Sequence, residues 1–359
     1  MILKIVFVVP SFAGGGAERV MIALANRCDR ELFSPSILAL DETGPLRKEV
    51  SNDVQVISLG KRSLRSALIA LGLSLRRQAP DIVVSTIGHL NLGVLMLRPF
   101  LPRGTRILVR EANDPMVTVS AIGLMGAGKY LYQLLYPRAT RVIVPSKLIS
   151  EVLTLDFGLD EKLIFRLSNP VDVEAIRAAA VEPFREPGDG LRFVAAGRLT
   201  PQKGFDRLLQ GLSDFPLDFH LTILGEGEDY ETLLNARDRL GLSERVSFVG
   251  FVANPWRYFA GADAFLLPSR WEGMPNAALE ALTCGTPVVA TPEAGGIMEI
   301  AAAATARAVT IAPDGEMFCR VLGSVLKGEE IRLRKSLLPD QFSIEVVVGS
   351  FERILLGDV

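Results

Sequence analysis

Two glutamates spaced eight positions apart, Glu272 and Glu280, are the first residues in this sequence that suggest chemistry. They belong to the segment PSRWEGMPNAALEALTCGTPVVAT, residues 268–291. Pro275 suits the first turn of a helix and Gly285 suits its end, so Glu272 precedes a predicted helix and Glu280 lies within it. Carboxylates accept hydrogen bonds from hydroxyl groups, whereas a helix N-terminus favours phosphate. This arrangement matches a ligand that combines sugar hydroxyls with phosphate, such as a nucleotide-sugar.

A second loop contributes two cations. In the segment AAGRLTPQKGFDRLL, Arg198 lies at the end of a predicted strand and Lys203 in the loop that follows, ahead of a helix that begins near Phe205. A guanidinium fork and a compact ammonium charge together suit a diphosphate. The alternative is a solvated loop without a ligand. The Gly-rich loop in the first half of the chain favours the phosphate interpretation.

That Gly-rich loop, PSFAGGGAERV, lies between a predicted strand and a predicted helix. Gly15 and Gly16 allow the backbone to approach a phosphate closely, and the first N–H groups of the helix point toward it. The alternative is a tight structural turn. Arg19 occupies the place of the third glycine of a dinucleotide fingerprint. Asp41, at the end of the second predicted strand, keeps open an NAD-dependent oxidoreductase, which would leave the two cations and the two glutamates without a purpose.

Short β-branched runs alternate with helical patterns along the chain, which predicts an α/β fold with parallel sheets covered by helices. The strands predicted in the first half are residues 4–9, 35–40, 55–59, 81–86, 106–110 and 141–146. Those predicted in the second half are residues 191–197, 219–225, 246–250, 264–269, 287–291 and 307–312. The sequence therefore predicts two Rossmann-like doubly wound domains that face each other across a cleft, with ligands at the carboxyl ends of the strands.

The predicted boundaries follow from this alternation. The N-terminal domain covers residues 1–168, a connection rich in Pro and Gly covers 169–190, and the C-terminal domain covers 191–340. A helix at about 343–356 is expected to pack back on the N-terminal domain.

Composition and cysteine content indicate an ordinary globular protein. Hydrophobic residues make up 49% of the chain and charged residues 22%, which is typical of soluble domains. The three widely spaced cysteines predict reduced core residues, with neither a disulfide nor a metal site. The apolar N-terminal run ends at Pro10 and predicts a buried strand instead of a signal peptide, and no apolar run reaches 18 residues. The expected location is cytoplasmic.

The stretch from Glu272 to Glu280, EGMPNAALE, resembles the E-x7-E motif of family-4 retaining glycosyltransferases with the GT-B fold. The segments GRLTPQKG, ILGEGED, VSFVGFV and GGIMEI match this family in order and spacing, as does GGGAERV near the N-terminus. The resemblance covers roughly residues 1 to 300 and is strongest between 191 and 300. It points to the bacterial enzymes that assemble polysaccharides and lipid-linked oligosaccharides.

The resemblance implies a retaining transfer of a hexose or N-acetylhexosamine from a nucleotide-sugar. Arg198 and Lys203 would grip the donor diphosphate, Glu280 would bind the ribose, and Glu272 would contact the transferred sugar. The remaining donor contacts would come from backbone and side-chain groups at Gly15, Gly16, Gly250, Phe251, Val252, Gly273, Met274, Pro275, Asn276 and Ala277.

The same resemblance implies that the donor is a substrate and that no cofactor is needed. A UDP-sugar is the expected donor, with GDP-mannose as the next choice. The sequence contains no Asp-x-Asp pair, so no metal is expected, and the two cations would take the place of a metal at the diphosphate.

The loop after the fifth N-terminal strand departs from the family pattern. Many members carry a histidine there, whereas this chain has VREANDP, with Glu111, Ala112 and Asn113. The segment resembles a subgroup with S-E-R-N-D-P, and Ala112 fills a position often occupied by a larger polar residue. Glu111 and Asn113 are candidate sugar or acceptor contacts, and the alternative is that they cap the following turn. His89 after the fourth strand is a further candidate, or else an ordinary surface histidine, whereas His220 in a strand pattern is predicted to be structural.

Charge is distributed unevenly along the chain. Residues 1–170 carry 21 Lys and Arg against 14 Asp and Glu, while residues 171–359 carry 18 against 27. Residues 60–80, with Leu64, Leu68, Leu71 and Leu75 among basic side chains, and residues 116–141 are both apolar and basic. Either segment is a candidate for peripheral binding to an anionic membrane, where a saccharide or lipid-linked saccharide acceptor would be received. The alternative is an amphipathic helix whose apolar face belongs to the core, and no nucleic-acid partner is expected.

A protein without catalytic activity is the alternative to an enzyme. A non-catalytic GT-B subunit that binds sugars or scaffolds a partner would share the fold. The presence of Arg198, Lys203, Glu272 and Glu280 together argues against it.

Overall fold

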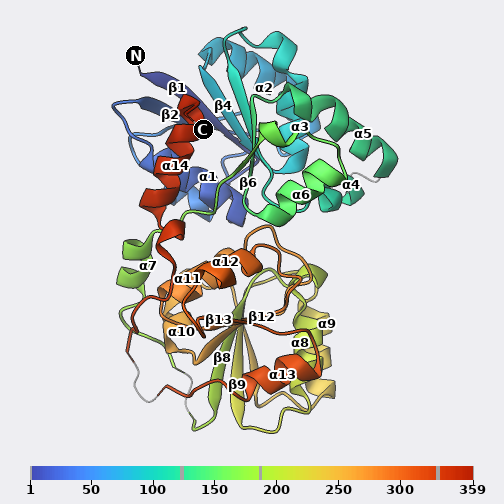
Figure 1. The fold of residues 1–359 in the computed structure, drawn as a ribbon, viewed down its shortest axis with the longest axis vertical. Coiled ribbons are helices and arrows are strands. Elements are labelled where there is room, and N and C mark those ends of the chain that lie inside the picture. Colours follow the sequence, from blue (N-terminus) through green and yellow to red (C-terminus); the bar gives the residue numbers. More distant parts are fainter. Residues whose placement is uncertain (1, 122–124, 186–187, 329–331, 359) are drawn as a thin grey trace. The chain divides into compact units, whose positions relative to one another are not determined.

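The structure is a computed structural model that describes residues 2–121, 125–185, 188–328 and 332–358. The chain divides into two compact units, the first made of residues 1–170 with 344–359 and the second of residues 171–343. Each unit is a parallel sheet covered by helices, as Figure 1 shows. The predicted α/β class with two doubly wound sheets is confirmed.

Seven parallel strands form the sheet of the first unit, in the order β3-β2-β1-β4-β5-β6-β7. They are β1 (Leu3–Val9), β2 (Phe33–Ala39), β3 (Gln55–Ser58), β4 (Ile82–Thr86), β5 (Arg106–Arg110), β6 (Arg141–Val144) and β7 (Ile164–Arg166). The order reverses between β1 and β4, which makes this the switch point of the sheet. The first six strands were predicted. The seventh was missed because three residues at a sheet edge are too short to give a periodic signal.

Helices cover both faces of this sheet. They are α1 (Gly16–Arg27), α2 (Leu64–Gln78), α3 (Gly88–Met96), α4 (Pro115–Ala121), α5 (Met125–Leu135), α6 (Lys147–Leu155) and α14 (Ile344–Leu356). One core lies between the sheet and helices α1 and α14. A second core lies on the other face, under α2, α3, α5 and α6. Burial on both faces explains why the strands are nearly continuous apolar runs.

The apolar side of α2 belongs to the second of these cores. Leu71 and Leu75 are fully buried, and Leu64 and Leu68 pack against the same cluster. The expectation that these leucines lie on a membrane is therefore wrong, because their surface is already used in packing. Among the residues that the structure describes, no helix has the length and apolar character needed to cross a bilayer.

The second unit contains six parallel strands in the order β10-β9-β8-β11-β12-β13. They are β8 (Leu191–Ala196), β9 (Phe219–Leu224), β10 (Val246–Gly250), β11 (Ala264–Leu267), β12 (Val288–Ala290) and β13 (Val309–Ile311). All six were predicted from their β-branched runs. Here the order reverses between β8 and β11.

The helices of the second unit also cover both faces of its sheet. They are α7 (Val173–Ala179), α8 (Phe205–Leu212), α9 (Tyr230–Arg239), α10 (Trp256–Gly261), α11 (Asn276–Thr283), α12 (Ile297–Ala303) and α13 (Glu316–Leu322). Residues of α7, α10, α11 and α12 share one core. Those of α8, α9 and α13 share the other.

The stretch predicted as a connection, residues 169–190, contains the helix α7 and is counted with the second unit from residue 171 onward. The Val171 N–H donates to the Phe342 carbonyl oxygen at 3.0 Å. Arg177 Nη1 donates to the carbonyl oxygens of Thr283 and Arg334, both at 3.0 Å. Pro and Gly content alone predicted a linker, whereas these long-range hydrogen bonds make the segment part of a folded unit.

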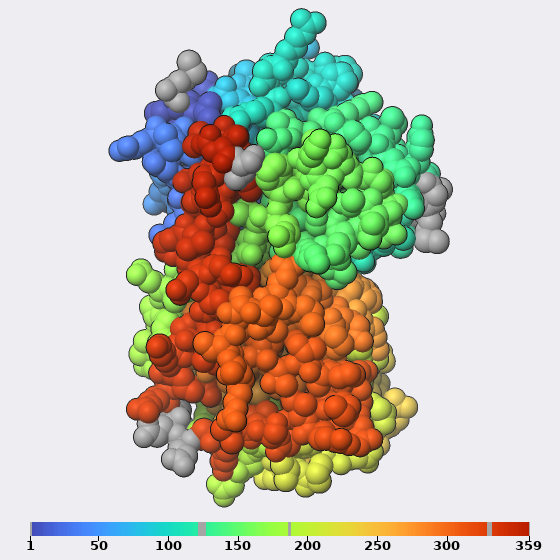
Figure 2. Space-filling view, in the orientation of Figure 1, coloured from blue at the N-terminus to red at the C-terminus, as the bar shows by residue number. Residues whose placement is uncertain are grey.

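The C-terminal helix α14 packs against the sheet of the first unit and forms part of its surface (Figures 1 and 2). Phe351 is fully buried, and its ring centroid lies 6.0 Å from that of Phe7 on β1. A segment that is distant in sequence therefore completes the first core.

Replacing Phe351 with Ala should lower the free energy of unfolding by about 3–5 kcal/mol, because it leaves a cavity against β1. Urea unfolding followed by circular dichroism measures this loss. Val346→Ala on the same helix is the matched control, since Val346 is 47% exposed, and it should change stability by less than about 0.5 kcal/mol. Equal losses for the two variants would contradict the packing role of α14.

Candidate functional site

The predicted donor-binding residues of the second half gather at one edge of the second sheet. Arg198 follows β8, Phe251 follows β10, and Glu272 follows β11 by a short loop. All strands of this sheet are parallel, so their carboxyl ends lie along the same edge. The loops after β8 and β11 lie at the switch point, where parallel sheets bind ligands.

Lys203 and Glu272 form an ion pair within this group. Lys203 Nζ donates to Glu272 Oε1 at 2.5 Å, and Ser269 Oγ donates to the same oxygen at 2.8 Å. The Glu272 residue is buried and the Lys203 side chain mostly so. The sequence predicted separate ligand contacts for these residues, and the structure shows that they also hold each other.

Glycines on both sides of Lys203 allow this contact. A Cβ at Gly197 would lie 2.9 Å from Lys203 Cε, so the lysine side chain crosses directly over the glycine. Gly204 has a φ of +67°, and a Cβ there would lie 2.1 Å from the Pro268 carbonyl oxygen. The loops after β8 and β11 therefore pack backbone against backbone, which only glycine permits.

Glu280 lies on α11, the helix that the sequence predicted from Pro275 to Gly285. Pro275 precedes its first residue, and Gly285 follows its end with a φ of +78°, so both terminus signals are confirmed. The Glu280 residue is half-buried. Trp256 Nε1, at the start of α10, donates to Glu280 Oε2 at 2.9 Å. The sequence analysis did not identify Trp256.

The segment between the two glutamates packs against the loop that contains Gly295 and Gly296. The donor contacts predicted in this segment are buried at Gly273, Met274 and Pro275 and half-buried at Asn276 and Ala277. Gly295, with a φ of +60°, would place a Cβ 1.9 Å from the Glu272 carbonyl oxygen, and the Gly296 N–H donates to the Gly273 carbonyl oxygen at 3.1 Å. The GGIMEI segment therefore holds the backbone that carries Glu272.

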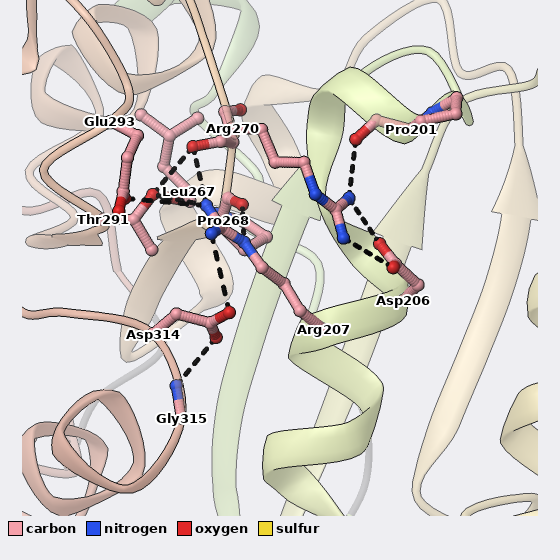
Figure 3. Close-up of polar contacts among 11 residues, drawn as sticks. Pro201, Asp206, Arg207, Leu267, Pro268, Arg270, Thr291, Glu293, Asp314 and Gly315 are labelled. Carbon is pink, nitrogen blue, oxygen red and sulfur yellow. Dashed lines mark hydrogen bonds and ion pairs between the residues drawn. The ribbon is translucent and has the colours of Figure 1, made fainter.

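Arg207 of α8 ties together three loops at this edge (Figure 3). Its Nε and Nη2 donate to the carbonyl oxygens of Pro268 and Ser269, each at 2.8 Å. Nη1 also lies 3.5 Å from Asp314 Oδ2, and Nη2 lies 3.8 Å from Glu293 Oε2. Sequence reasoning missed this residue, although it lies one helical turn after Lys203.

A second arginine fixes the turn that carries Lys203. Arg270 makes a bidentate pair with Asp206 at 2.8 and 2.7 Å, and it donates to the Pro201 carbonyl oxygen at 2.7 Å (Figure 3). Its hydrogen bonds hold the pKa of the Asp206 carboxyl below the ordinary value. Pro201 begins the short turn that ends at Lys203. The hydrogen bond from Arg270 therefore fixes the backbone of the turn that carries the lysine.

Two other predicted donor residues face solvent. The Arg198 residue is exposed and has no hydrogen bond or ion pair within the described part of the chain. Phe251 is 63% exposed and follows Gly250, which has a φ of +80°. Val252 is half-buried. An exposed cation and an exposed ring at the same edge of the sheet as the buried ion pair are suited to phosphate and base.

Gly15 and Gly16 belong to the first unit, at the start of α1 and after the carboxyl end of β1. A Cβ at Gly15 would lie 2.1 Å from Glu18 Oε2, so the glutamate side chain folds back over this glycine. The predicted placement of these glycines between a strand and a helix is confirmed, whereas their contact with a donor stays a prediction.

The histidines and Asn113 have clear local surroundings. His89 is exposed in the first turn of α3, and partial desolvation lowers the pKa of its imidazole. Asn113 Oδ1 accepts a hydrogen bond from the Asp114 N–H at 2.9 Å, which agrees with the turn-capping alternative. His220 Nε2 lies 3.1 Å from Ser247 Oγ on the neighbouring strand, so its structural role is confirmed.

Glu111 is buried in the first unit. It is 1% exposed, and its carboxylate accepts hydrogen bonds from the hydroxyl groups of Tyr136 and Tyr132, the latter at 3.2 Å. Its role as a sugar or acceptor contact stays a prediction, although in the structure strand alternation turns this side chain into the core under α5. Burial raises the pKa of Glu111 to about 7, although the hydrogen bonds from Tyr136 and Tyr132 and the charge of Arg110 oppose the rise.

Stability should fall as the pH rises through this pKa. The folded protein holds the Glu111 proton up to a pH of about 7, while an ordinary glutamate releases it near 4.5. Between these values the folded state binds more protons than the unfolded state, so up to about 3 kcal/mol is lost by pH 7. Tyr132, Tyr136 and Arg110 titrate above this window.

Urea unfolding at pH 5 and pH 8 measures this loss. Glu111→Gln, which has no proton to release, should remove most of the difference between the two pH values. Glu151→Gln is the control, because Glu151 is an exposed carboxylate of the same unit, and it should keep the wild-type difference. The same difference in all three proteins would contradict the assignment.

The cysteines show no sign of chemistry. Cys28 and Cys284 are buried, Cys319 is half-buried, and all three are free thiols. Burial raises the pKa of both Cys28 and Cys284 to about 12, which leaves them as unreactive thiols. Within the described residues, no group of three or more His, Cys, Asp or Glu side chains could hold a metal ion.

Family comparisons cover most of the chain. Residues 14–175 match the family model Glycosyltransferase Family 4, and residues 177–337 match the model Glycosyl transferases group 1. The boundary between the two matches lies close to the boundary between the two units.

Curated relatives match the chain over a part of its length. An N-acetylgalactosamine-N,N'-diacetylbacillosaminyl-diphospho-undecaprenol 4-alpha-N-acetylgalactosaminyltransferase of Campylobacter jejuni is 32% identical over 42% of this chain and 40% of its own length. The lipopolysaccharide core biosynthesis glycosyltransferase LpsE of Rhizobium meliloti is 30% identical over 48% and 49%. The matches thus span less than half of these relatives.

Solved structures match the whole chain. The lipopolysaccharide outer core galactosyltransferase WaaB has a TM-score of 0.71 at 18% identity and covers 99% of this chain and 100% of its own. Anabaena Alr3699/HepE in complex with UDP-glucose has a TM-score of 0.77 at 18% identity, with the same coverage. These likenesses show a common GT-B fold.

Proposed function

Because this chain belongs to the glycosyltransferases with a family 4 first domain and a group 1 second domain, we propose that it transfers a sugar from a nucleotide-sugar donor to a saccharide acceptor. The transferred group is a hexose or N-acetylhexosamine, and the donor is a UDP-sugar. Two observations on similar proteins support this choice. The Campylobacter relative is named as an N-acetylgalactosaminyltransferase, and a protein of the same fold is described in complex with UDP-glucose.

The observation that carries the proposal is the grouping of Arg198, Lys203, Glu272 and Glu280 at one edge of a single sheet. In the proposed site the two cations bind the diphosphate and Glu280 binds the ribose hydroxyls. The base lies beside Gly250, Phe251 and Val252, and the backbone from Met274 to Ala277 binds phosphate or sugar oxygens.

The ion pair adds a detail to the proposed role of Lys203. An ammonium group has three N–H donors, and Glu272 takes one of them. The other donors can be directed at phosphate oxygens while the lysine stays in place. Glu272 Oε2 has no hydrogen bond within the described residues, so it is available for a hydroxyl of the transferred sugar.

The proposed reaction retains the configuration of the sugar. As the nucleoside diphosphate departs, negative charge grows on its phosphate, where Arg198 and Lys203 already lie, so that little reorganisation is needed. The acceptor attacks from the same face, and the departing phosphate takes its proton. In this scheme no protein nucleophile is required. The two cations neutralise the diphosphate charge that a metal ion would otherwise neutralise.

Replacing Lys203 with Ala should weaken UDP binding by at least about tenfold, because a charge-assisted contact to phosphate is lost and Glu272 is left buried without its partner. Isothermal titration calorimetry in the presence of EDTA measures the affinity and tests metal independence in the same experiment. Lys335→Ala, an exposed lysine of the same unit, is the control and should bind as the wild type does. Unchanged UDP affinity in Lys203→Ala would contradict the diphosphate assignment.

For the acceptor we propose a lipid-linked saccharide presented at an anionic membrane. The first half of the chain is the basic half. The outward side of α2 carries two exposed apolar residues one turn apart, Ile69 at 79% and Leu73 at 65% exposure, next to the exposed Arg65, Arg76 and Arg77. Two exposed apolar side chains with arginines on the same helix suit the interface of an anionic bilayer. The helices α4 and α5 offer a second exposed apolar surface, at Met116, Val117, Tyr130 and Leu134.

The protein should sediment with vesicles that contain phosphatidylglycerol, and salt should weaken the binding. The double change Ile69→Gln and Leu73→Gln should reduce the bound fraction several-fold, while Leu326→Gln, an exposed leucine of the second unit, should not. If Tyr130→Gln with Leu134→Gln causes the loss instead, the contact surface is that of α4 and α5. The absence of wild-type binding at low salt would contradict the membrane proposal.

A further inference from the structure

Trp256 joins the start of α10 to the middle of α11. Its Nε1 donates to Glu280 Oε2 at 2.9 Å. At the same residue, the backbone carbonyl oxygen lies 3.7 Å from Cys284 Sγ, the residue that caps α11. Both the side chain and the backbone of Trp256 are therefore held by α11. The tryptophan and the glutamate are half-buried, so this hydrogen bond is partly shielded from water.

This contact restricts the rotation of the Glu280 side chain. A glutamate rotates about three bonds, whereas an indole is a rigid group that can donate but not accept a hydrogen bond. An ionised carboxylate has about four acceptor positions, so the hydrogen bond from Trp256 occupies one of them and is compatible with bonds from hydroxyl groups.

We infer that Trp256 is a positioning residue for the donor: its indole N–H fixes the Glu280 carboxylate in the orientation that receives the ribose hydroxyls. The inference rests on the proposed function, since it concerns the same nucleotide site. Trp256 touches the glutamate and acts on the donor through it.

The position of Trp256 along the chain extends this role. Trp256 directly follows the loop of residues 251–255, which carries the proposed base contacts Phe251 and Val252. Asn254 Nδ2 in this loop donates to the Ala179 carbonyl oxygen at 2.8 Å, which fixes the loop to the end of α7. The same indole thus connects the loop proposed for the base with the carboxylate proposed for the ribose.

The test compares UDP with 2′,3′-dideoxy-UDP, which lacks both ribose hydroxyls, by calorimetry on the full chain. Trp256→Phe keeps an aromatic ring and removes only the donor group. It should weaken UDP binding by about tenfold, and it should change the affinity for the dideoxy nucleotide by less than about twofold. A ring that served only for packing would affect both nucleotides equally.

Two further variants isolate the hydrogen bond. Tyr258→Phe removes a hydroxyl group from the same helix without touching Glu280, and it should bind UDP as the wild type does. In a Glu280→Ala background, where the acceptor of the indole N–H is absent, Trp256→Phe should cause little additional loss, so the two effects are not additive. Thermal unfolding of each variant confirms that it is folded.

The outcomes separate the two levels of the proposal. If the wild type binds UDP but Trp256→Phe binds it equally well, or weakens both nucleotides to the same extent, the positioning role is overturned and the nucleotide site stands. Additive losses in the double variant would overturn it as well. If the wild type binds none of UDP, GDP and ADP, the proposed function fails and this inference fails with it.

Discussion

The close approach of the loops after β8 and β11 is the constraint on which the candidate site depends. Gly204 faces the Pro268 carbonyl oxygen at a distance that leaves no room for a side chain, and Lys203 crosses directly over Gly197. Because of this approach, a lysine and a glutamate 69 residues apart form a 2.5 Å ion pair. A side chain at Gly204 would force the loops apart, and one at Gly197 would displace the Lys203 side chain, so either would disturb the ion pair.

Two arginines hold these loops in place by donating hydrogen bonds to backbone carbonyl oxygens. Arg207 donates to the carbonyl oxygens of Pro268 and Ser269, and Arg270 donates to that of Pro201. Each is itself balanced by carboxylates, Arg270 by Asp206 and Arg207 by Asp314 and Glu293. The charges of these two supporting arginines are thus balanced by neighbouring carboxylates. A fixed arrangement of this kind is what stabilisation of a departing phosphate requires, since its dipoles need little rearrangement during the reaction.

In the first unit, two charged residues are buried in the core at the end of a strand. Arg110 and Glu111 are consecutive residues at the end of β5, and alternation along the strand sends their side chains to opposite faces of the sheet. Glu111 meets Tyr132 and Tyr136, whereas Arg110 donates to Asn169. Desolvation raises the pKa of Glu111 to about 7 and lowers that of Arg110 to about 10, so both charged forms are disfavoured by burial. The resemblance to a family motif suggested a ligand contact here, but a motif does not report which face of a strand is covered.

Most elements and their order could be predicted from the amino-acid sequence. Short apolar runs marked twelve of the thirteen strands found in the described residues, and terminus signals such as Pro275 and Gly285 placed α11 correctly, because these patterns depend on neighbouring residues alone. The sequence also placed Arg198 at the end of a strand, Lys203 in the loop that follows it and Glu272 just before a helix, and parallel topology brings such loops to one edge. Which side chains meet became visible only in three dimensions: Lys203 with Glu272, Trp256 with Glu280, and Glu111 with two tyrosines. Such pairs join residues far apart in the chain, and they depend on how helices and loops pack over the sheet, which local periodicity does not encode.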